Sequence, residues 1–368
     1  MIPVTKPFMP PRDKLNKYID GIYERQWLTN DGPLVRELTQ RLEAFLNVKN
    51  LLLVSNGTLA LQVAFSVLNV SNKKVKNCEP TAITTPFTFA ATTSALCWEG
   101  ISPVYCDIKE KDWCLDESKV EALIDENTAA IVPVHVFGSA CDCEELEGIA
   151  SRHTLPLIFD AAHAFDVQYK GRSLLSYGDA STLSFHATKL FHSIEGGAIV
   201  FKNKKDLETA KKIINFGLGS GNSIEHIGLN AKMNEFQAAM ALCNLDEFEL
   251  IKQERKHVCK YYESRLSLYF PVQATLATKN YSYFPVLFDS ESQLINVMGR
   301  LSNYGFSARR YFSPSLNQVK VYTEHYYPCP ISEDVSSRIL CLPLFFGIKD
   351  SDLEKIVNIV IDIVGIKK

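Results

Sequence analysis

Between about residues 50 and 200, short apolar runs rich in β-branched residues alternate with longer segments of helical periodicity. The runs are LLLVS, TAITTP, SPVYCDI, AAIVPVHV, LPLIFDAA, STLSF and GGAIVFK, and the helices expected between them cover 58–68, 89–98, 117–124 and 143–152. This alternation predicts an α/β fold with a large, mostly parallel sheet covered by helices. Ligands bind such sheets at the carboxyl ends of the strands, so the residues that end these runs are the first functional candidates.

The rest of the chain predicts a second, smaller unit. After Met233 a helical pattern runs without Gly or Pro for more than thirty residues and is expected to link the two units. Beyond it, short strands alternate with a helix around 290–304 and a final amphipathic helix from Asp350, which indicates an α+β arrangement. We therefore expect a large domain over 1–245 and a small C-terminal domain over 246–368.

Charge and composition exclude several function classes. The formal net charge is −3, and no concentrated basic face is available to bind a nucleic-acid backbone. The N-terminal MIPVTKPFMPPRDK interrupts the apolar core that a signal peptide needs, and no window approaches the roughly 18 apolar residues of a membrane span. Of ten scattered cysteines only Cys141 and Cys143 are close together. We expect a cytoplasmic protein with reduced thiols, no metal site, and neither nucleic acid nor membrane as a partner.

Two strand ends carry candidate binding groups. In VSNGTLALQ, Gly57 and Thr58 open a helix whose backbone N–H groups could hold a phosphate, although for this motif alone a plain turn with Thr58 as the helix cap is the more ordinary role. In FDAAHAF, Asp160 ends an apolar run, where an ionised carboxylate implies a cationic partner. The alternative is a helix N-cap. His163 is by default a hydrogen-bonded, half-buried histidine.

A third strand end adds an isolated lysine. In SFHATKLFHSIEGG, Ser184 ends a strand and Lys189 follows without charged neighbours in its segment. A desolvated lysine is the residue type that forms Schiff bases with carbonyl compounds. Together the three motifs fit pyridoxal 5'-phosphate (PLP), with the phosphate at Gly57, Thr58 and Ser184, the pyridinium nitrogen at Asp160 and the aldehyde at Lys189. Phe89 could stack on the ring.

Seven ordered motifs carry a resemblance to a known family over nearly the whole chain. They are QWLTNDGP, SNGT, TPFTFAATTSAL, PVHVFG, DAAHAF, SFHATK…EGG and GLNAKMNEFQAA, with CLPLF near the end. The chain resembles the DegT/DnrJ/EryC1/StrS nucleotide-sugar aminotransferases, which have the aspartate aminotransferase (type I) fold. The resemblance implies that Lys189 forms the Schiff base and that Asp160 holds the ring nitrogen. It further implies that Asn230 reaches the phosphate from a neighbouring subunit, in a homodimer with shared active sites.

Two positions depart from the family's usual pattern. His163 stands where many members have a glutamine that hydrogen-bonds the cofactor's ring oxygen, and an imidazole can donate the same bond. Lys232 stands where members often have arginine, which puts any bidentate carboxylate contact of that position in doubt. The sister dehydratases have histidine in place of the Schiff-base lysine, so Lys189 indicates an aminotransferase.

The activity implied by this resemblance is ping-pong transfer of an amino group from L-glutamate, which leaves 2-oxoglutarate, to a dTDP-linked keto-6-deoxyhexose in surface-glycan synthesis such as that of O-antigen. The motifs look most like members that aminate C4 of dTDP-4-keto-6-deoxy-D-glucose, and amination of C3 in a 3-keto sugar is the alternative.

Two other classes of function are a non-catalytic PLP-fold regulator and a nicotinamide-dependent enzyme, although no GxGxxG follows a strand. Candidate substrate contacts are Thr29, His186, Arg309 and Tyr311.

Overall fold

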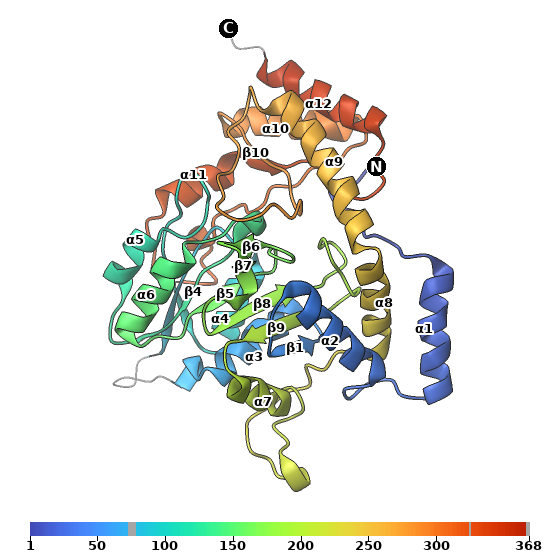
Figure 1. The fold of residues 1–368 in the computed structure, drawn as a ribbon. Helices are drawn as coiled ribbons and strands as arrows, with labels where there is room; N and C mark the ends of the chain where they lie inside the picture. Colours follow the sequence, from blue (N-terminus) through green and yellow to red (C-terminus); the bar gives the residue numbers. More distant parts are fainter. Residues whose placement is uncertain (73–78, 324, 366–368) are drawn as a thin grey trace.

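The computed structural model describes residues 1–72, 79–323 and 325–365, and a central sheet organises most of them (Figure 1). The strand order is β3-β2-β4-β5-β8-β9-β1, since isolated parallel bridges at Ile131–Leu157 and Val134–Asp160 join the two parts of the sheet. The strands are β1 (Leu51–Val54), β2 (Thr81–Thr84), β3 (Ser102–Tyr105), β4 (Thr128–Val132), β5 (Ile158–Asp160), β8 (Ala180–Ser184) and β9 (Gly197–Phe201). Only β9 runs antiparallel to its neighbours among these strands, so the sheet is mostly parallel, as the sequence predicts.

The strands are apolar on both sides because helices cover both faces of the sheet. Successive side chains of β1 alternate between two separate apolar clusters: Leu51 and Leu53 belong to one, and Leu52 and Val54 to the other. The first cluster includes side chains of α2 (Pro33–Leu46), α6 (Cys143–His153) and α8 (Glu235–Asp246). The second includes side chains of α3 (Gly57–Val67), α4 (Ala90–Trp98) and α7 (Lys204–Ile213).

A smaller α+β unit follows α8. The single long helix expected after Met233 is in fact two, α8 and α9 (Phe248–Leu266), because Glu247 between them has φ −100° and ψ 5°. Beyond them, a third apolar cluster joins α9 to α10 (Glu291–Asn303), α12 (Asp350–Val364) and the antiparallel pair β10 (Pro285–Leu287) and β11 (Ile339–Cys341). In Figure 1 this unit lies above the sheet, and α9 leads into it.

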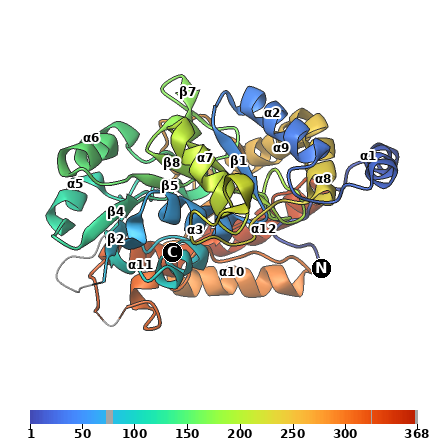
Figure 2. The same cartoon turned by 90° about the horizontal axis from the view of Figure 1, so that it is seen from below.

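The remaining elements lie around these layers. They are α1 (Arg12–Arg25), α5 (Glu117–Val120), the short hairpin β6 (Gln168–Tyr169) and β7 (Arg172–Ser173), and α11 (Pro330–Arg338). Both views place α1 at the edge of the molecule (Figures 1 and 2). No helix in the described ranges is long and apolar enough to cross a membrane.

A buried glutamate fixes the loop before α2. The Glu235 carboxylate accepts hydrogen bonds from the N–H groups of Leu34 and Val35, both at 3.0 Å, which satisfies two free donors in the first turn of α2. The N-cap of that helix, Gly32, leaves room for this contact, since a Cβ there would lie 2.4 Å from the Glu235 carboxyl carbon. The loop that carries Thr29 is thus anchored to the start of α8.

Candidate active site

A cavity of about 240 Å³ lies where β5 and β8 end and α3 begins. Its walls come from both parts of the chain, because residues of the C-terminal unit complete it. The sequence-predicted residues that line it are Gly57, Thr58, Phe89, Asp160, His163, Ser184, His186, Lys189, Arg309 and Tyr311. Residues separated by more than two hundred positions are thereby brought to one site.

Lys189 lies in the loop between β8 and β9, and its side chain is half-buried. Its ammonium donates a long hydrogen bond of 3.4 Å to the Tyr283 hydroxyl. Desolvation lowers the pKa of Lys189 to about 8. The Asp160 carboxylate acts to raise this pKa, and the charge of Arg309 acts to lower it. About a tenth of this side chain is therefore a neutral, nucleophilic amine at pH 7, far more than in an ordinary lysine.

Asp160 ends β5 and lines the cavity. Oδ2 accepts a hydrogen bond from the Thr92 hydroxyl at 2.7 Å, and Oδ1 accepts one from the Ala162 N–H at 3.1 Å. Burial raises the pKa of this carboxyl, while Thr92, Ala162 and the Lys189 ammonium oppose the rise. A cation placed against Asp160 would favour its ionised form.

The start of α3 forms a cradle for an anion. The side chain of Asn56, not that of Thr58, caps the helix by accepting the Leu59 N–H at 2.8 Å. Thr58 is therefore not the cap, and it lines the cavity beside Gly57 and Ser184. Gly57 must lack a side chain here, since a Cβ would lie 2.8 Å from the Ser184 Cβ. Free N–H groups and hydroxyls at this helix end suit a phosphate.

His163 lies in a stack of aromatic rings. Its Nδ1 accepts a hydrogen bond from the Phe137 N–H at 3.1 Å, and its ring lies nearly parallel to those of Phe137 and Phe312. Desolvation, assisted by Lys189, lowers the pKa of His163 well below its ordinary value. The neutral ring with an accepting Nδ1 carries its proton on Nε2, so His163 is a hydrogen-bond donor at the cavity.

Two predicted residues do not line this cavity within one chain. Thr29 is exposed in the loop before α2, where its carbonyl accepts the Trp27 indole N–H at 2.6 Å. Asn230 is also exposed, in a bridge with Asn215. Nearby, the Lys232 ammonium donates to the Asn215 side chain at 3.0 Å and lies over the Phe216 ring; it forms no ion pair with the residues described.

Several lining or supporting residues were missed by the sequence argument, and four of them contact the predicted residues. Thr92 holds Asp160, Tyr283 contacts Lys189, Phe312 stacks beside His163, and Glu195 lies at the cavity near His186. Thr92 and Glu195 lie in motifs that stand out in the sequence, TPFTFAATTSAL and EGG. Tyr283 and Phe312 have no such signal, because only the tertiary fold brings them to the site.

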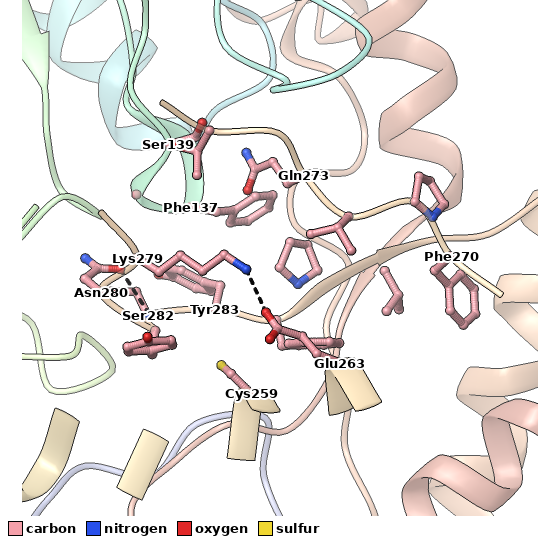
Figure 3. Close-up of a pocket in the computed structure, with 18 of the residues that line it drawn as sticks. Phe137, Ser139, Cys259, Glu263, Phe270, Gln273, Lys279, Asn280, Ser282 and Tyr283 are labelled. Atoms are coloured by element: carbon pink, nitrogen blue, oxygen red, sulfur yellow. Dashed lines mark hydrogen bonds and ion pairs between the residues drawn. The ribbon is translucent and has the colours of Figure 1, made fainter. Parts of the chain in front are cut away.

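A second cavity of about 100 Å³, lined by Phe137 among others, shares Tyr283 with the first (Figure 3). It lies between α9 and the segment 270–286, and its lysine, Lys279, is paired with Glu263 at 2.7 Å. Across the stretches of chain that are described, no group of three or more His, Cys, Asp or Glu side chains could hold a metal ion. Most of the predicted reactive and binding side chains, Lys189 and Asp160 among them, therefore line the larger cavity.

The larger cavity has the parts that PLP requires. A desolvated lysine, a buried carboxylate with one hydroxyl and one N–H already bound to it, and a helix N-terminus lined by small residues all face the same space. These groups match an aldehyde, a basic ring nitrogen and a phosphate in turn. The donor set therefore fits this cofactor.

Comparisons with known proteins agree with this geometry. The sequence matches the DegT/DnrJ/EryC1/StrS aminotransferase family over residues 11–361. It is 35% identical to a dTDP-4-amino-4,6-dideoxy-D-glucose transaminase of Shigella dysenteriae and 32% identical to one of Escherichia coli, with 98% of each chain covered in both cases. The structure of DesI in the presence of its TDP-sugar product superposes with a TM-score of 0.90 at 32% identity, covering 98% of this chain and 92% of that one. The chain therefore belongs to the DegT/DnrJ/EryC1/StrS family of PLP-dependent sugar aminotransferases.

Proposed function

We propose that this enzyme transfers the amino group of L-glutamate to C4 of dTDP-4-keto-6-deoxy-D-glucose, forming dTDP-4-amino-4,6-dideoxyglucose and 2-oxoglutarate. The observation that carries the proposal is the desolvated Lys189 in one cavity with Asp160 and the α3 N-terminus. The choice of sugar is supported by relatives named for this product that match across nearly the full chain.

In this proposal the chain's residues divide the work of binding. Gly57, Thr58 and Ser184 hold the phosphate, Asp160 holds a proton on the ring nitrogen, and Phe89 and the His163 Nε2–H contact the ring and its oxygen. When bound, PLP supplies the aldehyde carbon and the electron-withdrawing ring. Thr92 keeps the Asp160 carboxylate oriented through the 2.7 Å hydrogen bond.

Lys189 is the proton carrier. With a pKa of about 8, Nζ can take a proton from the amino-bearing carbon of the donor and later deliver one to C4 of the sugar. Tyr283 holds Nζ near this position through its hydroxyl. The Tyr283 segment is itself fixed, because the buried Arg255 donates to the carbonyls of Tyr281 and Ser282 at 2.9 and 2.6 Å.

Arg309 is the proposed contact for an anionic group of the substrates. It lines the cavity with Tyr311, its guanidinium lies 4.7 Å from the Tyr311 ring centroid, and it forms no ion pair with any carboxylate in the part of the chain described. An arginine without a carboxylate partner beside a reactive lysine suits a carboxylate of L-glutamate.

We also propose a homodimer in which Asn230 completes the partner's phosphate site. Asn230 is exposed and lies outside its own cavity, so it is available to another chain. The neighbouring apolar side chains Ile224 and Ile227 are 78% and 96% exposed, which favours their burial by a second copy.

The decisive experiment is incubation of the PLP-loaded enzyme and L-glutamate with dTDP-4-keto-6-deoxy-D-glucose, and separately with its 3-keto isomer. NMR of the products should place the new C–N bond at C4 of the 4-keto sugar. A product aminated only at C3, or none from either sugar, would contradict the proposed substrate. A yellow protein that never forms 2-oxoglutarate would instead indicate a non-catalytic role.

A further inference from the structure

The loop between β8 and β9 carries two polar side chains that the proposed transfer does not use. His186 and Glu195 both line the cavity, with His186 Nε2 3.5 Å from Glu195 Oε1. His186 Nδ1 lies 2.7 Å from the Thr188 hydroxyl and accepts the Thr188 N–H at 3.2 Å. Because Nδ1 accepts that N–H, the ring's hydrogen is on Nε2 and points toward the Glu195 carboxylate.

The backbone that presents Glu195 is both strained and tightly held. Ile194, directly before it, has φ +71°, which is an outlier for a β-branched residue. Within one chain the Ile194 side chain is 49% exposed, so burial of that side chain does not offset the strain. Such strain collects at functional sites, where the surrounding structure enforces it.

Hydrogen bonds and close packing enforce this conformation. The Glu195 carbonyl accepts from the Ser193 hydroxyl at 2.9 Å and from the Gln237 side chain at 2.7 Å, which ties the turn to the capped start of α8. A Cβ on Gly196 would lie 1.9 Å from the Ser193 hydroxyl oxygen, so the turn has no space for a side chain at this position. These contacts fix the backbone of Glu195 beside the cavity.

Charge indicates which part of the substrates this carboxylate can accept. L-Glutamate and the dTDP group are anionic and would be repelled by Glu195, whereas sugar hydroxyls are neutral donors. Among the residues described, His186 is the one basic side chain within 4 Å of the Glu195 carboxylate, and the Glu195 side chain remains 55% exposed. It therefore keeps lone pairs free for hydroxyl groups.

We propose that Glu195 binds a hydroxyl group of the sugar ring and that His186 is the positioning residue that orients its carboxylate. The inference rests on the proposed function, since it assumes a nucleotide sugar in this cavity. The proposal assigns the two substrates to different walls of the cavity. Arg309 favours the carboxylate of L-glutamate, and Glu195 favours the hydroxyl groups of the sugar. The two substrates of a ping-pong reaction could then share one site.

A binding measurement tests this without turnover. Calorimetric titration with dTDP-6-deoxy-D-glucose, which has the hydroxyls but no ketone, should show about tenfold weaker binding to Glu195→Gln than to the unaltered enzyme. Titration with dTDP alone should give the same affinity for both. The matched control is Glu354→Gln, because Glu354 is an exposed glutamate on α12. This variant should keep the affinities for both dTDP-6-deoxy-D-glucose and dTDP. Equal weakening of both ligands by Glu195→Gln, or of neither, would overturn the assignment.

The separate half-reactions give a second readout. The loss of yellow absorbance on adding L-glutamate alone should keep its rate in Glu195→Gln, with a KM for L-glutamate that is unchanged or lower. The return of absorbance on adding keto sugar should show a KM raised about tenfold. Slowing of the glutamate half-reaction alone would refute a role in sugar binding.

His186 should act only through Glu195. His186→Ala should weaken sugar binding in the unaltered enzyme and add nothing to Glu195→Gln. His186→Gln, which keeps a donor, should recover part of the loss. Additive effects of His186→Ala and Glu195→Gln would contradict positioning. If the wild-type enzyme aminates a different nucleotide sugar, the same variants apply to that sugar, so this inference and the proposed substrate can fail separately.

Discussion

Two lysine–carboxylate sets line the two cavities that share Tyr283, and they are arranged in opposite ways. In the smaller cavity, Lys279 lies 2.7 Å from Glu263, and both side chains are partly exposed (Figure 3). In the larger cavity, Lys189 hydrogen-bonds only to a neutral tyrosine among the described residues, and Asp160 is bound by Thr92 and Ala162. A carboxylate balances the charge of the Lys279 ammonium, whereas burial without a direct carboxylate contact makes Lys189 a reactive amine.

The largest expected effect separates the two lysines directly. Lys189→Ala should abolish transamination and the yellow absorbance of the PLP-loaded protein, because no other amine lines the larger cavity in the described chain. Lys279→Ala removes the same group from the neighbouring cavity and should keep nearly full activity. Absorption spectra and 2-oxoglutarate release measure both, and an active, yellow Lys189→Ala enzyme would disprove the assignment.

Asp160→Asn should have the next largest effect. It keeps the shape of the side chain but removes the charge that holds a proton on the ring nitrogen, so we expect kcat to fall about a hundredfold or more. Glu263→Gln, the matching change in the smaller cavity, should leave kcat within about twofold. Steady-state kinetics with thermal melting would separate a loss of catalysis from a loss of folded protein. Comparable kcat values for the two variants would mean that the carboxylates of the two cavities do not differ in their role.

The pH dependence of cofactor attachment should report the desolvation of Lys189. Only the neutral amine attacks an aldehyde, so below a pKa of about 8 the rate of PLP attachment to cofactor-free protein should fall about tenfold per pH unit. Arg309 lowers this pKa, so Arg309→Gln should move the midpoint to higher pH. Stopped-flow absorbance would measure both profiles. A midpoint near that of an ordinary lysine would mean that burial does not activate Lys189.

Tyr283→Phe should have the smallest effect, because it removes one long hydrogen bond and leaves the ring packing in place. We expect activity to fall about two- to fivefold with no loss of cofactor. Single-turnover rates would detect the change. A loss as large as that of Asp160→Asn would show that the tyrosine hydroxyl takes part in proton transfer.

The local signals in the sequence predict much of this arrangement. The strand runs end where β5 and β8 end, and the residues at those ends line one cavity. Periodicity does not reveal that β9 runs antiparallel between β8 and β1, nor that the helix after Met233 breaks at Glu247. Strand direction depends on pairing between distant segments, and that break has neither Gly nor Pro to mark it.

For the active site, too, the sequence predicts only part of the arrangement. Asp160 stands out because a charge at the end of an apolar run is unusual, and Lys189 stands out because it has no charged neighbours in its segment. Thr92 and Tyr283 do not, since a threonine in a helix and a tyrosine near a strand are ordinary until the fold places them against those two charges. Thr29 and Asn230 lie outside the cavity of their own chain, so a role in the site stays a prediction for both, and for Asn230 it depends on a second copy.

The position of Lys189, His186 and Glu195 within the single loop 185–196 has a consequence for how such enzymes diversify. Recombination that exchanges this loop between relatives would move the reactive amine and the proposed sugar contact together, as one cassette. New acceptor preferences would then arise by point substitution at Glu195 or His186, or by changes in the surrounding walls, while the amine is inherited unchanged. A library confined to these two positions would be the shortest route to altered sugar selectivity.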